Sequence, residues 1–401
     1  MAASRPHLTL GDPVVISQSP PEERRWGPWQ FPMVTRLADG RILVNYSVGK
    51  DTASAYGTGK AQALSADEGA TWQPLTEAEA DALPGGFPTP NGDRLRQRAL
   101  RSILTADFDL PAPIGEGLGG YGSQERHFLL AQLPPELQRG WPLDRLPRGE
   151  TEWREEQPRV TFPGEVRTAF RDWSTSEEMM FFPFFEFEVF RTAPDGSLWA
   201  PSYWMRWDEA AGRLLGHAAS FLRSTDDGHS WSLASDIPYQ PDPETDPFWD
   251  QRGGFTEPEL AFLPDGSLLC LLRTHDGHGP GPLYESRSED GGLTWSRPVV
   301  FDRYGVWPQL LVLPSGLTVM AYGRKGLVLR VTADPAGRAW SDPFPVPLPA
   351  DPIGLTDGTC AYTALLPLGG STVLLVYSNF AYPDPSGVLH KTILARRVEI
   401  V

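Results

Sequence analysis

The pattern of apolar and polar positions is clearest between residues 254 and 295, where it describes one compact unit. Residues 254–273 contain two apolar runs joined at Pro264-Asp265-Gly266, which is the pattern of a β-hairpin. A third run near Leu283–Ser288 is followed by a tight turn that closes on Trp295. Together these runs predict one antiparallel sheet of four strands in about 45 residues, which is the size of a propeller blade.

The turn at the end of this unit recurs along the chain. An eight-residue box, Ser-x-Asp-x-Gly-x-Thr/Ser-Trp, occupies Ser65–Trp72, Ser224–Trp231 and Ser288–Trp295, and a degenerate copy lies at Thr332–Trp340. The aspartate of a box can accept backbone N–H bonds and the glycine can take a positive φ, so each box predicts a turn between two strands. The tryptophans of the three complete boxes are predicted to be buried between neighbouring sheets.

These boxes resemble the Asp-box (BNR) repeats of the sialidase-like superfamily, and the resemblance covers residues 28–397. It implies an all-β fold, a six-bladed β-propeller with four-stranded antiparallel blades, formed by residues 1–401 as a single domain. In that family the box lies away from the active site, so its residues are expected to be structural. Val14–Ser17 is expected to pair with the C-terminal strand and close the ring, which removes exposed strand edges.

The repeat is weakest between the first two complete boxes. We expect blade 2 between residues 94 and 162, where strand-like runs such as His127–Leu133 occur without a box. Residues 76–125 are expected to include a loop-rich insertion, because long Gly/Pro-rich segments occur there. Within it, Thr-Glu-Ala-Glu at a helix start predicts a short helix over Thr76–Leu83.

Charged residues near strand ends are the candidates for chemistry. Glu257 lies near the start of one hairpin strand and Arg273 at the end of the next, so the two side chains are predicted to share one edge of the sheet. Glu186 and Glu188 lie at nearly the same distance before the hairpin turn of blade 3, which is expected at about Phe181–Leu233, as Glu257 does in its own blade. The two side chains share one face of their strand, between aromatic neighbours. Because the innermost strand of each blade lines the central channel of a propeller, we expect these groups to converge there.

The resemblance implies a role for several of these residues. Tyr362, in Ala-Tyr-Thr-Ala-Leu, is similar to the family's tyrosine nucleophile. Glu257 is similar to the glutamate that would take its proton, and Asp51 to the aspartic acid/base that precedes the first box. Arg273 and Arg324 are similar to arginines that bind the substrate carboxylate.

One position departs from the family pattern. The first-blade signature of the family is Arg-Ile-Pro, whose arginine completes the carboxylate-binding triad, and this chain has Gln30-Phe31-Pro32. Gln30 is therefore expected to offer hydrogen bonds to the substrate but no charge to a carboxylate. Glu188 is the remaining candidate for substrate binding.

The implied chemistry is that of exo-α-sialidases: a glycoside hydrolase that cleaves a terminal sugar, which can be acidic, with retention. A neutral phenol can attack an anomeric centre that carries a carboxylate, because it avoids the repulsion that a carboxylate nucleophile would meet. Arginines can give that carboxylate bidentate hydrogen bonds. Structural roles stay open for three residues: inter-blade packing for Tyr362, pairing with Glu257 alone for Arg273, and a loop turn for Asp51.

The resemblance implies a carbohydrate as the partner, and charge argues against two other classes of partner. The formal net charge is −16 without any basic block, which argues against nucleic acid and anionic membranes. The N-terminus has no apolar signal region and no apolar run approaches the ~20 residues of a membrane span, so a cytoplasmic protein is expected. His275 and His278 lack further ligands for a metal site, and no motif predicts a cofactor.

Two alternatives compete with the sialidase-like hypothesis. One is a propeller hydrolase that uses two carboxylates, Glu186 and Glu257, on a neutral sugar, as an exo-arabinanase family does. In such enzymes a carboxylate separation of about 5–5.5 Å favours retention and about 6.5–9.5 Å favours inversion. The other is a non-catalytic propeller that binds glycan or protein, since propellers host all three functions.

Overall fold

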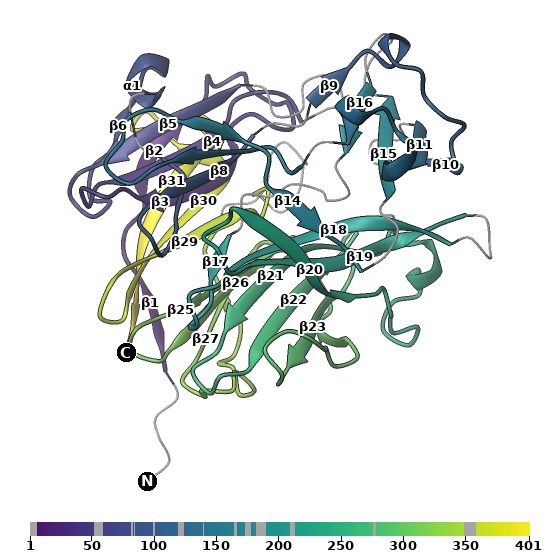
Figure 1. The fold of residues 1–401 in the computed structure, drawn as a ribbon. Coiled ribbons are helices and arrows are strands. Elements are labelled where there is room, and N and C mark those ends of the chain that lie inside the picture. Colours follow the sequence, from purple (N-terminus) through teal and green to yellow (C-terminus); the bar gives the residue numbers. More distant parts are fainter. Residues whose placement is uncertain are drawn as a thin grey trace.

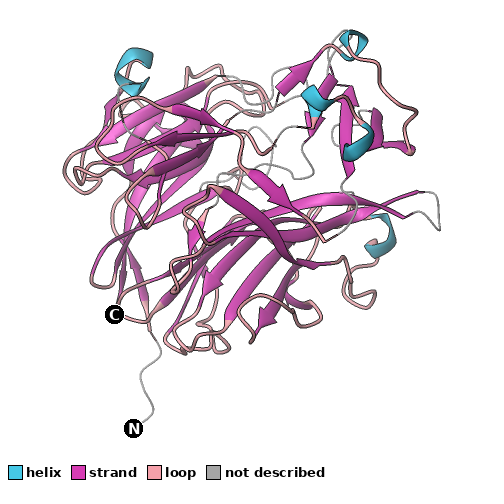
Figure 2. Cartoon of the chain, in the orientation of Figure 1, coloured by secondary structure: helices cyan, strands magenta, loops and turns pink. Residues whose placement is uncertain are grey.

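The chain folds as the predicted six-bladed β-propeller, and nearly all of its regular structure is β (Figures 1 and 2). The computed structural model describes all residues except 1–5, 52–58, 82, 84, 99–100, 119–123, 139, 164–166, 173–177, 182–189, 209–212, 276–277 and 349–357.

In each blade the strands pair in the order in which they occur along the chain, and in blade 2 residues 98–142 separate the second strand from the third. Blade 1 contains β3 (Gln30–Arg36), β4 (Ile42–Ser47), β5 (Lys60–Ser65) and β6 (Gln73–Pro74), and blade 2 contains β7 (Phe87–Pro88), β8 (Arg94–Gln97), β12 (Leu143–Leu146) and β13 (Arg154–Glu156). Blade 3 contains β17 (Arg191–Thr192), β18 (Leu198–Asp208), β19 (Arg213–Ser224) and β20 (Ser230–Ile237), and blade 4 contains β21 (Phe255–Phe262), β22 (Leu268–Thr274), β23 (Leu283–Ser288) and β24 (Val299–Asp302). Blade 5 contains β25 (Val306–Val312), β26 (Thr318–Gly323), β27 (Leu327–Thr332) and β28 (Phe344–Pro345), and blade 6 contains β29 (Thr363–Gly369), β30 (Thr372–Pro383) and β31 (Leu389–Ile400).

Two N-terminal strands close the ring. Both β1 (Leu8–Leu10) and β2 (Val14–Gln18) pair antiparallel with β31, so the predicted pairing of Val14–Ser17 with the C-terminal strand is confirmed. Blade 3 departs from the purely antiparallel pattern, because β14 (Arg159–Thr161) adds a parallel edge strand next to β20.

A seventh sheet stands apart from the blades, at the upper right of Figure 1. It contains β9 (Arg101–Ile103), β10 (Gly115–Leu118), β11 (Gln124–Leu129), β15 (Arg167–Asp172) and β16 (Glu178–Phe181), in the order β10-β11-β15-β16-β9. The expectation that His127–Leu133 belongs to blade 2 was therefore wrong. Its strand pairs with β15 in this inserted sheet, while blade 2 is completed by β12 and β13.

The hydrophobic core is divided into clusters that lie between neighbouring blades. Strands such as β22 are buried along their whole length, because each sheet packs against another on both faces. Between blades 4 and 5, for example, Leu269 and Leu271 pack with Met320 and Tyr322. Similar clusters join blades 2 and 3, 3 and 4, 5 and 6, and 6 and 1. This stacking brings the first strands β21, β25, β29 and β3 next to one another.

Each box is a turn that its aspartate holds. The Asp226 carboxylate accepts hydrogen bonds from the backbone N–H of Ser230 (2.9 Å) and from the hydroxyls of Ser230 (2.6 Å) and Ser224 (2.7 Å). Asp67 and Asp290 make the same set of contacts in their own boxes. The box residues therefore serve the turn, as expected of structural residues.

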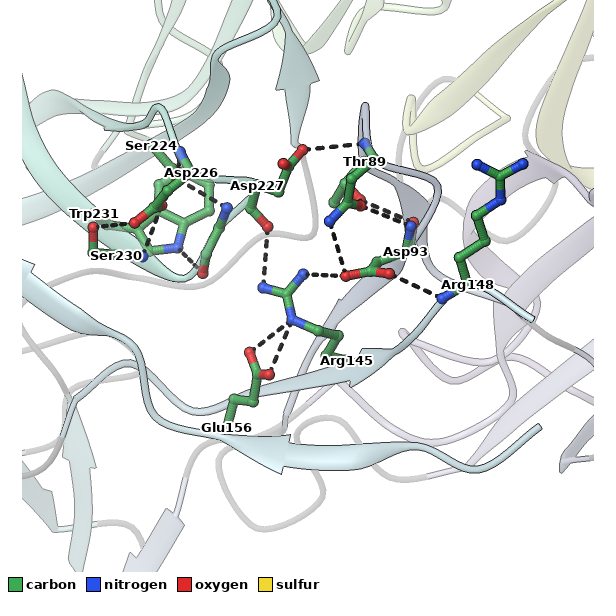
Figure 3. Close-up of polar contacts among 12 residues, drawn as sticks. Thr89, Asp93, Arg145, Arg148, Glu156, Ser224, Asp226, Asp227, Ser230 and Trp231 are labelled. Carbon is green, nitrogen blue, oxygen red and sulfur yellow. Dashed lines mark hydrogen bonds and ion pairs between the residues drawn. The ribbon is translucent and has the colours of Figure 1, made fainter. Parts of the chain in front are cut away.

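An arginine from the preceding blade holds two of the boxes in place. Arg145 of blade 2 donates to the carbonyl of Asp227 in the blade 3 box (3.0 Å) and also pairs with two carboxylates (Figure 3). Arg397 of blade 6 donates to the carbonyl of Glu68 in the blade 1 box (3.1 Å). Both carbonyls belong to residues with positive φ, 57° and 59°, so the left-handed turn is what presents the carbonyl to the neighbouring blade.

Two local predictions can be compared with the structure directly. Trp231 is buried as predicted and packs against Trp141 and Phe190, whereas Trp72 and Trp295 are only half-buried. The predicted short helix is present as α1 (Glu77–Asp81). Thr76 caps it: the Glu79 carboxylate accepts from the Thr76 N–H (2.8 Å), and the Thr76 hydroxyl accepts from the Glu79 N–H (3.3 Å).

Candidate active site

Three first strands begin with the same distortion, in which a bulky residue of positive φ precedes a proline. The residues are Phe31 (φ 55°), Glu257 (φ 48°) and Trp307 (φ 48°), in blades 1, 4 and 5. The strand register slips at each of these positions, so all three residues lie in bulges. Positive φ is uncommon for bulky residues and costs on the order of 1–3 kcal/mol, and such outliers cluster at functional sites. A bulge disrupts the regular strand pairing and points the side chain in a different direction from that of an ordinary strand residue.

All three bulge residues converge on Tyr362, which precedes β29 of blade 6. The Tyr362 ring stacks on Trp307 with centroids 4.6 Å apart and meets Phe31 edge to face at 4.7 Å. Its hydroxyl donates a hydrogen bond to Glu257 and accepts one from Arg273 Nη1 at 3.0 Å. Blades 1, 4 and 5 therefore each contribute a contact to a phenol that belongs to blade 6.

The Glu257 carboxylate is held in one orientation. Its Oε2 accepts the backbone N–H of Trp307 at 2.9 Å, which leaves Oε1 for Tyr362 and for an ion pair with Arg273. Both partners of the ion pair are nearly buried. Glu257 is therefore oriented by a rigid backbone donor and aimed at the Tyr362 hydroxyl, which is the geometry that a general base needs.

The phenol of Tyr362 stays protonated in this environment. Burial is the main cause that raises its pKa well above the usual value, and the negative charge of Glu257 raises it further. The positive charges of Arg273 and Arg324 act in the opposite direction. Because a phenolate does not form on its own here, nucleophilic chemistry at Tyr362 requires a base in contact with the hydroxyl, and Glu257 is in that position.

Trp26 connects Asp51 to the rest of the site. Its indole N–H donates to Asp51 Oδ2 at 2.8 Å, and its ring meets Phe31 edge to face at 6.1 Å. The Arg324 guanidinium lies over the Trp26 ring at 5.5 Å. Gly27 permits this arrangement, because a Cβ there would lie 2.2 Å from the backbone nitrogen of Asp51.

A second glycine brings blades 5 and 6 together beside Tyr362. A Cβ at Gly323, the last residue of β26, would lie 2.5 Å from the Cβ of Ala361 and from the carbonyl of Gly326. Gly323 precedes Arg324, and Ala361 precedes Tyr362. The close approach of the two backbones is therefore what sets the distance between this arginine and the tyrosine.

The structure joins five of the residues singled out from the sequence into one chain of contacts: Asp51, Glu257, Arg273, Arg324 and Tyr362. Glu186 and Glu188 lie outside the described residues. Glu259, the second acid near the start of its strand, is not part of this group. It is buried in an ion pair with Arg191 of blade 3 (2.6 Å) and accepts the N–H of Leu310 of blade 5.

Gln30 is fully buried next to Phe31 rather than exposed at a surface. Within the described part of the chain, neither its Nε2 nor its Oε1 has a hydrogen-bond partner. An unsatisfied buried amide is costly, by about 1–3 kcal/mol. The position is therefore kept polar at the expense of stability.

Sequence reasoning missed the aromatic residues that shape the site, Trp26, Phe31 and Trp307. A signal for two of them was available, since Phe31-Pro32 and Trp307-Pro308 stand at the same place before their hairpin turns as Glu257-Pro258. Trp26 carries no such signal, because its position depends on the close contact at Gly27.

The described residues offer no group of three or more His, Cys, Asp or Glu that could hold a metal ion. Among the helices in that part of the chain, none combines the length and the apolar character that crossing a bilayer requires.

Residues 186–373 match the model of a family described as BNR repeat-like domain. No curated protein sequence matches the chain. Among solved structures, a protein of unknown function from Dyadobacter fermentans is 17% identical, with 98% of this chain and 99% of that chain covered and a TM-score of 0.63.

Two enzymes are among the similar structures. The α-L-arabinofuranosidase of Fusarium graminearum, in complex with an iminosugar inhibitor, is 15% identical over 97% of this chain and 98% of its own, with a TM-score of 0.51. A mutant form of the NanB sialidase of Streptococcus pneumoniae is 14% identical over 96% of this chain and 70% of its own, with a TM-score of 0.49. At these identities, the two similar structures with TM-scores above 0.5 support the fold alone.

Proposed function

We propose that this six-bladed β-propeller is a glycoside hydrolase that releases a terminal sugar with retention of configuration. The observation that carries the proposal is the contact of the Tyr362 hydroxyl with the Glu257 carboxylate, with Arg273 Nη1 3.0 Å from the same oxygen. A nucleophile, a base within hydrogen-bond reach and a neighbouring cation form the arrangement that activates a hydroxyl for attack.

In the first step Tyr362 Oη attacks the anomeric carbon and forms a glycosyl–tyrosine bond. Its proton passes to Glu257 Oε1, and the bond from the anomeric carbon to the leaving-group oxygen breaks. Asp51 protonates that oxygen as general acid. The raised pKa of Tyr362 is consistent with this order, because deprotonation accompanies attack and does not precede it.

In the second step a water molecule attacks the anomeric carbon from the side of the departed group. Asp51, now a carboxylate, takes the proton of the water. The glycosyl–tyrosine bond breaks, and the tyrosine oxygen recovers its proton from Glu257. Two inversions at one carbon give net retention, as in other hydrolases with a covalent intermediate.

The arginines indicate an acidic group on the sugar. Arg273 and Arg324 both act on the electrostatics of Tyr362, so a carboxylate bound between them would lie close to the nucleophile. Each would also offset locally the negative field of a chain with net charge −16. With the neutral Gln30 in place of a third arginine, such a carboxylate would be bound by fewer charges than sialic acid receives in sialidases.

One observation favours the alternative of a two-carboxylate hydrolase on a neutral sugar. Gln30 supplies an amide where the sialidase pattern has a charge, and an amide suits a hydroxyl. The similar structures include an α-L-arabinofuranosidase. In this alternative Glu257 acts with Glu186, and Tyr362 only positions Glu257.

A panel of aryl glycosides, including α-sialosides, uronides and α-L-arabinofuranosides, tests the proposal. The wild-type protein is expected to release the aryl alcohol from one class, and NMR is expected to show retention in the first-formed sugar. A fluorinated analogue of the accepted sugar should label Tyr362 in mass spectra of the digested protein. Retained turnover in Tyr362→Phe would favour the two-carboxylate alternative, and failure to hydrolyse any member of the panel would favour a binding propeller.

A further inference from the structure

Lys391, on β31 of blade 6, is a fully buried ammonium group. Its Nζ donates a hydrogen bond to the carbonyl of Arg25 at 2.7 Å and lies 5.1 Å from the centroid of the Phe380 ring. Among the described residues no carboxylate forms an ion pair with it: the nearby Glu23 is occupied by Arg25. A buried lysine without a paired carboxylate requires a reason.

Both groups that Lys391 contacts adjoin Trp26. Arg25 directly precedes Trp26, so the bonded carbonyl belongs to the peptide group that leads into the tryptophan. The Phe380 ring meets the Trp26 ring edge to face at 6.2 Å. Trp26 in turn donates its indole N–H to Asp51 at 2.8 Å. A continuous path of contacts therefore leads from the ammonium to the carboxyl group of Asp51.

The charge of Lys391 works against folding at neutral pH. Burial is the main cause that lowers the pKa of Lys391 to about 8. The charges of Arg25 and Arg24 lower this pKa further, while Glu23 and Cys360 raise it. A lysine whose folded-state pKa lies below its unfolded value binds fewer protons when folded, so stability rises with pH above about 8. An apolar side chain of similar length would therefore be the more stable choice.

We propose that Lys391 is a positioning residue of the active site, which holds the Arg25 carbonyl and the Phe380 ring so that Trp26 keeps its indole N–H on Asp51. The inference rests on the proposed function for the role of Asp51 as acid/base. The contacts of Lys391 with the Arg25 carbonyl and the Phe380 ring are independent of that function.

A dependence on pH follows. The protonated ammonium gives the Arg25 carbonyl a charge-assisted hydrogen bond and makes a cation–π contact with the Phe380 ring. When the amine is neutral, the hydrogen bond is weaker and the cation–π contact is lost. Activity is therefore expected to fall as pH rises through about 8. Tyr362 does not titrate in this range, because its pKa is raised well above the usual value, and burial also raises the pKa of Cys360.

The kinetic test compares Lys391→Met with Lys60→Met, which makes the same change at an exposed lysine. Lys391→Met is expected to lower kcat about 10-fold or more, to change KM less, and to lose the alkaline limb of the pH profile. Its unfolding temperature should equal or exceed that of the wild type, whereas a lysine needed only for folding would lower it. Wild-type kcat and pH profile in Lys391→Met would overturn the proposal.

A second measurement does not depend on turnover. The indole N–H signal of Trp26, assigned with Trp26→Phe in protein labelled with ¹⁵N-tryptophan, reports the bond to Asp51. It is expected to shift in Lys391→Met, to titrate in the wild type as pH rises through about 8, and to stay unchanged in Lys60→Met. If the wild type hydrolyses no glycoside, the proposed function fails, and this signal still decides the role of Lys391. A Trp26 signal that neither Lys391→Met nor pH changes would overturn the proposed role of Lys391.

Discussion

The Tyr362 hydroxyl bonds the Glu257 carboxylate although the two residues are 105 positions apart and belong to different blades. The contact depends on two separate distortions. Glu257 leaves its strand at a bulge with φ 48°, and Tyr362 follows Ala361, which has φ 68°. The pair is also enclosed by Trp307, which stacks on the phenol and fixes the carboxylate with its backbone N–H.

Tyr362→Phe and Glu257→Gln test this pair. Removal of the base is expected to lower kcat about 10²–10⁴-fold, the usual effect of losing general base catalysis. Removal of the nucleophile should cost at least as much, because the remaining steps depend on the covalent intermediate. Steady-state kinetics on the best aryl glycoside measure both effects. Tyr382→Phe, which removes a phenol outside the site, should retain wild-type turnover; a loss equal to that of Tyr362→Phe would show a global effect.

Gly323→Ala tests the close approach of blades 5 and 6. The added methyl group would lie 2.5 Å from the Cβ of Ala361, so one backbone must move, at a cost of about 1–3 kcal/mol. Since Ala361 precedes Tyr362, we expect kcat to fall together with the unfolding temperature. Gly85→Ala places the same group in open space and should change neither. Full activity in Gly323→Ala would mean that the blades adjust without moving Tyr362.

The Arg191–Glu259 ion pair is expected to stabilise the ring and not the chemistry. Glu259 is buried, and burial raises the pKa of its carboxyl group despite the charge of Arg191. Arg191→Ala leaves a buried charge without its partner and should lower the free energy of unfolding by about 3 kcal/mol at pH 7. Arg223→Ala, which breaks the more exposed pair with Asp195, should cost only about 0–1 kcal/mol.

The sign of the pH effect distinguishes a charge penalty from lost packing. A carboxyl group whose folded-state pKa is raised destabilises the folded state at pH above that value. The loss in Arg191→Ala is therefore expected to shrink as pH falls and Glu259 binds a proton, and urea unfolding at several pH values would measure it. A loss that stays constant with pH would indicate packing instead.

The sequence allowed prediction of those parts of the fold that depend on local geometry. The boxes specify a turn through the side chain of one aspartate, so blades 1, 3 and 4 could be placed from Asp67, Asp226 and Asp290 alone. Glu257 and Arg273 could be paired because a hairpin forces the ends of its two strands together. The partner Tyr362 required a resemblance, since nothing local in the chain relates blade 6 to blade 4.

The inserted sheet could not be predicted for the same reason. Its strands come from two stretches, before and after the last strands of blade 2, and β16 pairs with β9 across that interval. Pairing between distant strands leaves no periodic signal in either one. Lys391 was missed for a different reason: a lysine in an apolar run is usually exposed, and its burial here depends on the fold around Arg25 and Phe380.

Gln30 offers a test of whether stability has been given up for substrate binding. Its side chain is fully buried, with neither amide atom bonded within the described part of the chain. Gln30→Met keeps the length of the side chain and removes the polar atoms, so the free energy of unfolding should rise by about 1 kcal/mol or more. Gln138→Met provides the control: the exposed Gln138 amide donates to the carbonyl of Leu133 (2.6 Å), so its replacement should not stabilise the protein.

The kinetic effect of the same substitution should have the opposite sign. In the proposed site Gln30 offers the substrate a hydrogen bond that methionine cannot give, and a neutral hydrogen bond is worth about 0.5–1.5 kcal/mol. A fall in kcat/KM of roughly 2- to 10-fold is therefore expected for Gln30→Met on the best aryl glycoside, carried mainly by KM. Thermal unfolding and steady-state kinetics on one preparation measure both quantities. A variant that is more stable and equally active would show that the amide of Gln30 does not reach the substrate, and that specificity for the sugar depends on Arg273 and Arg324.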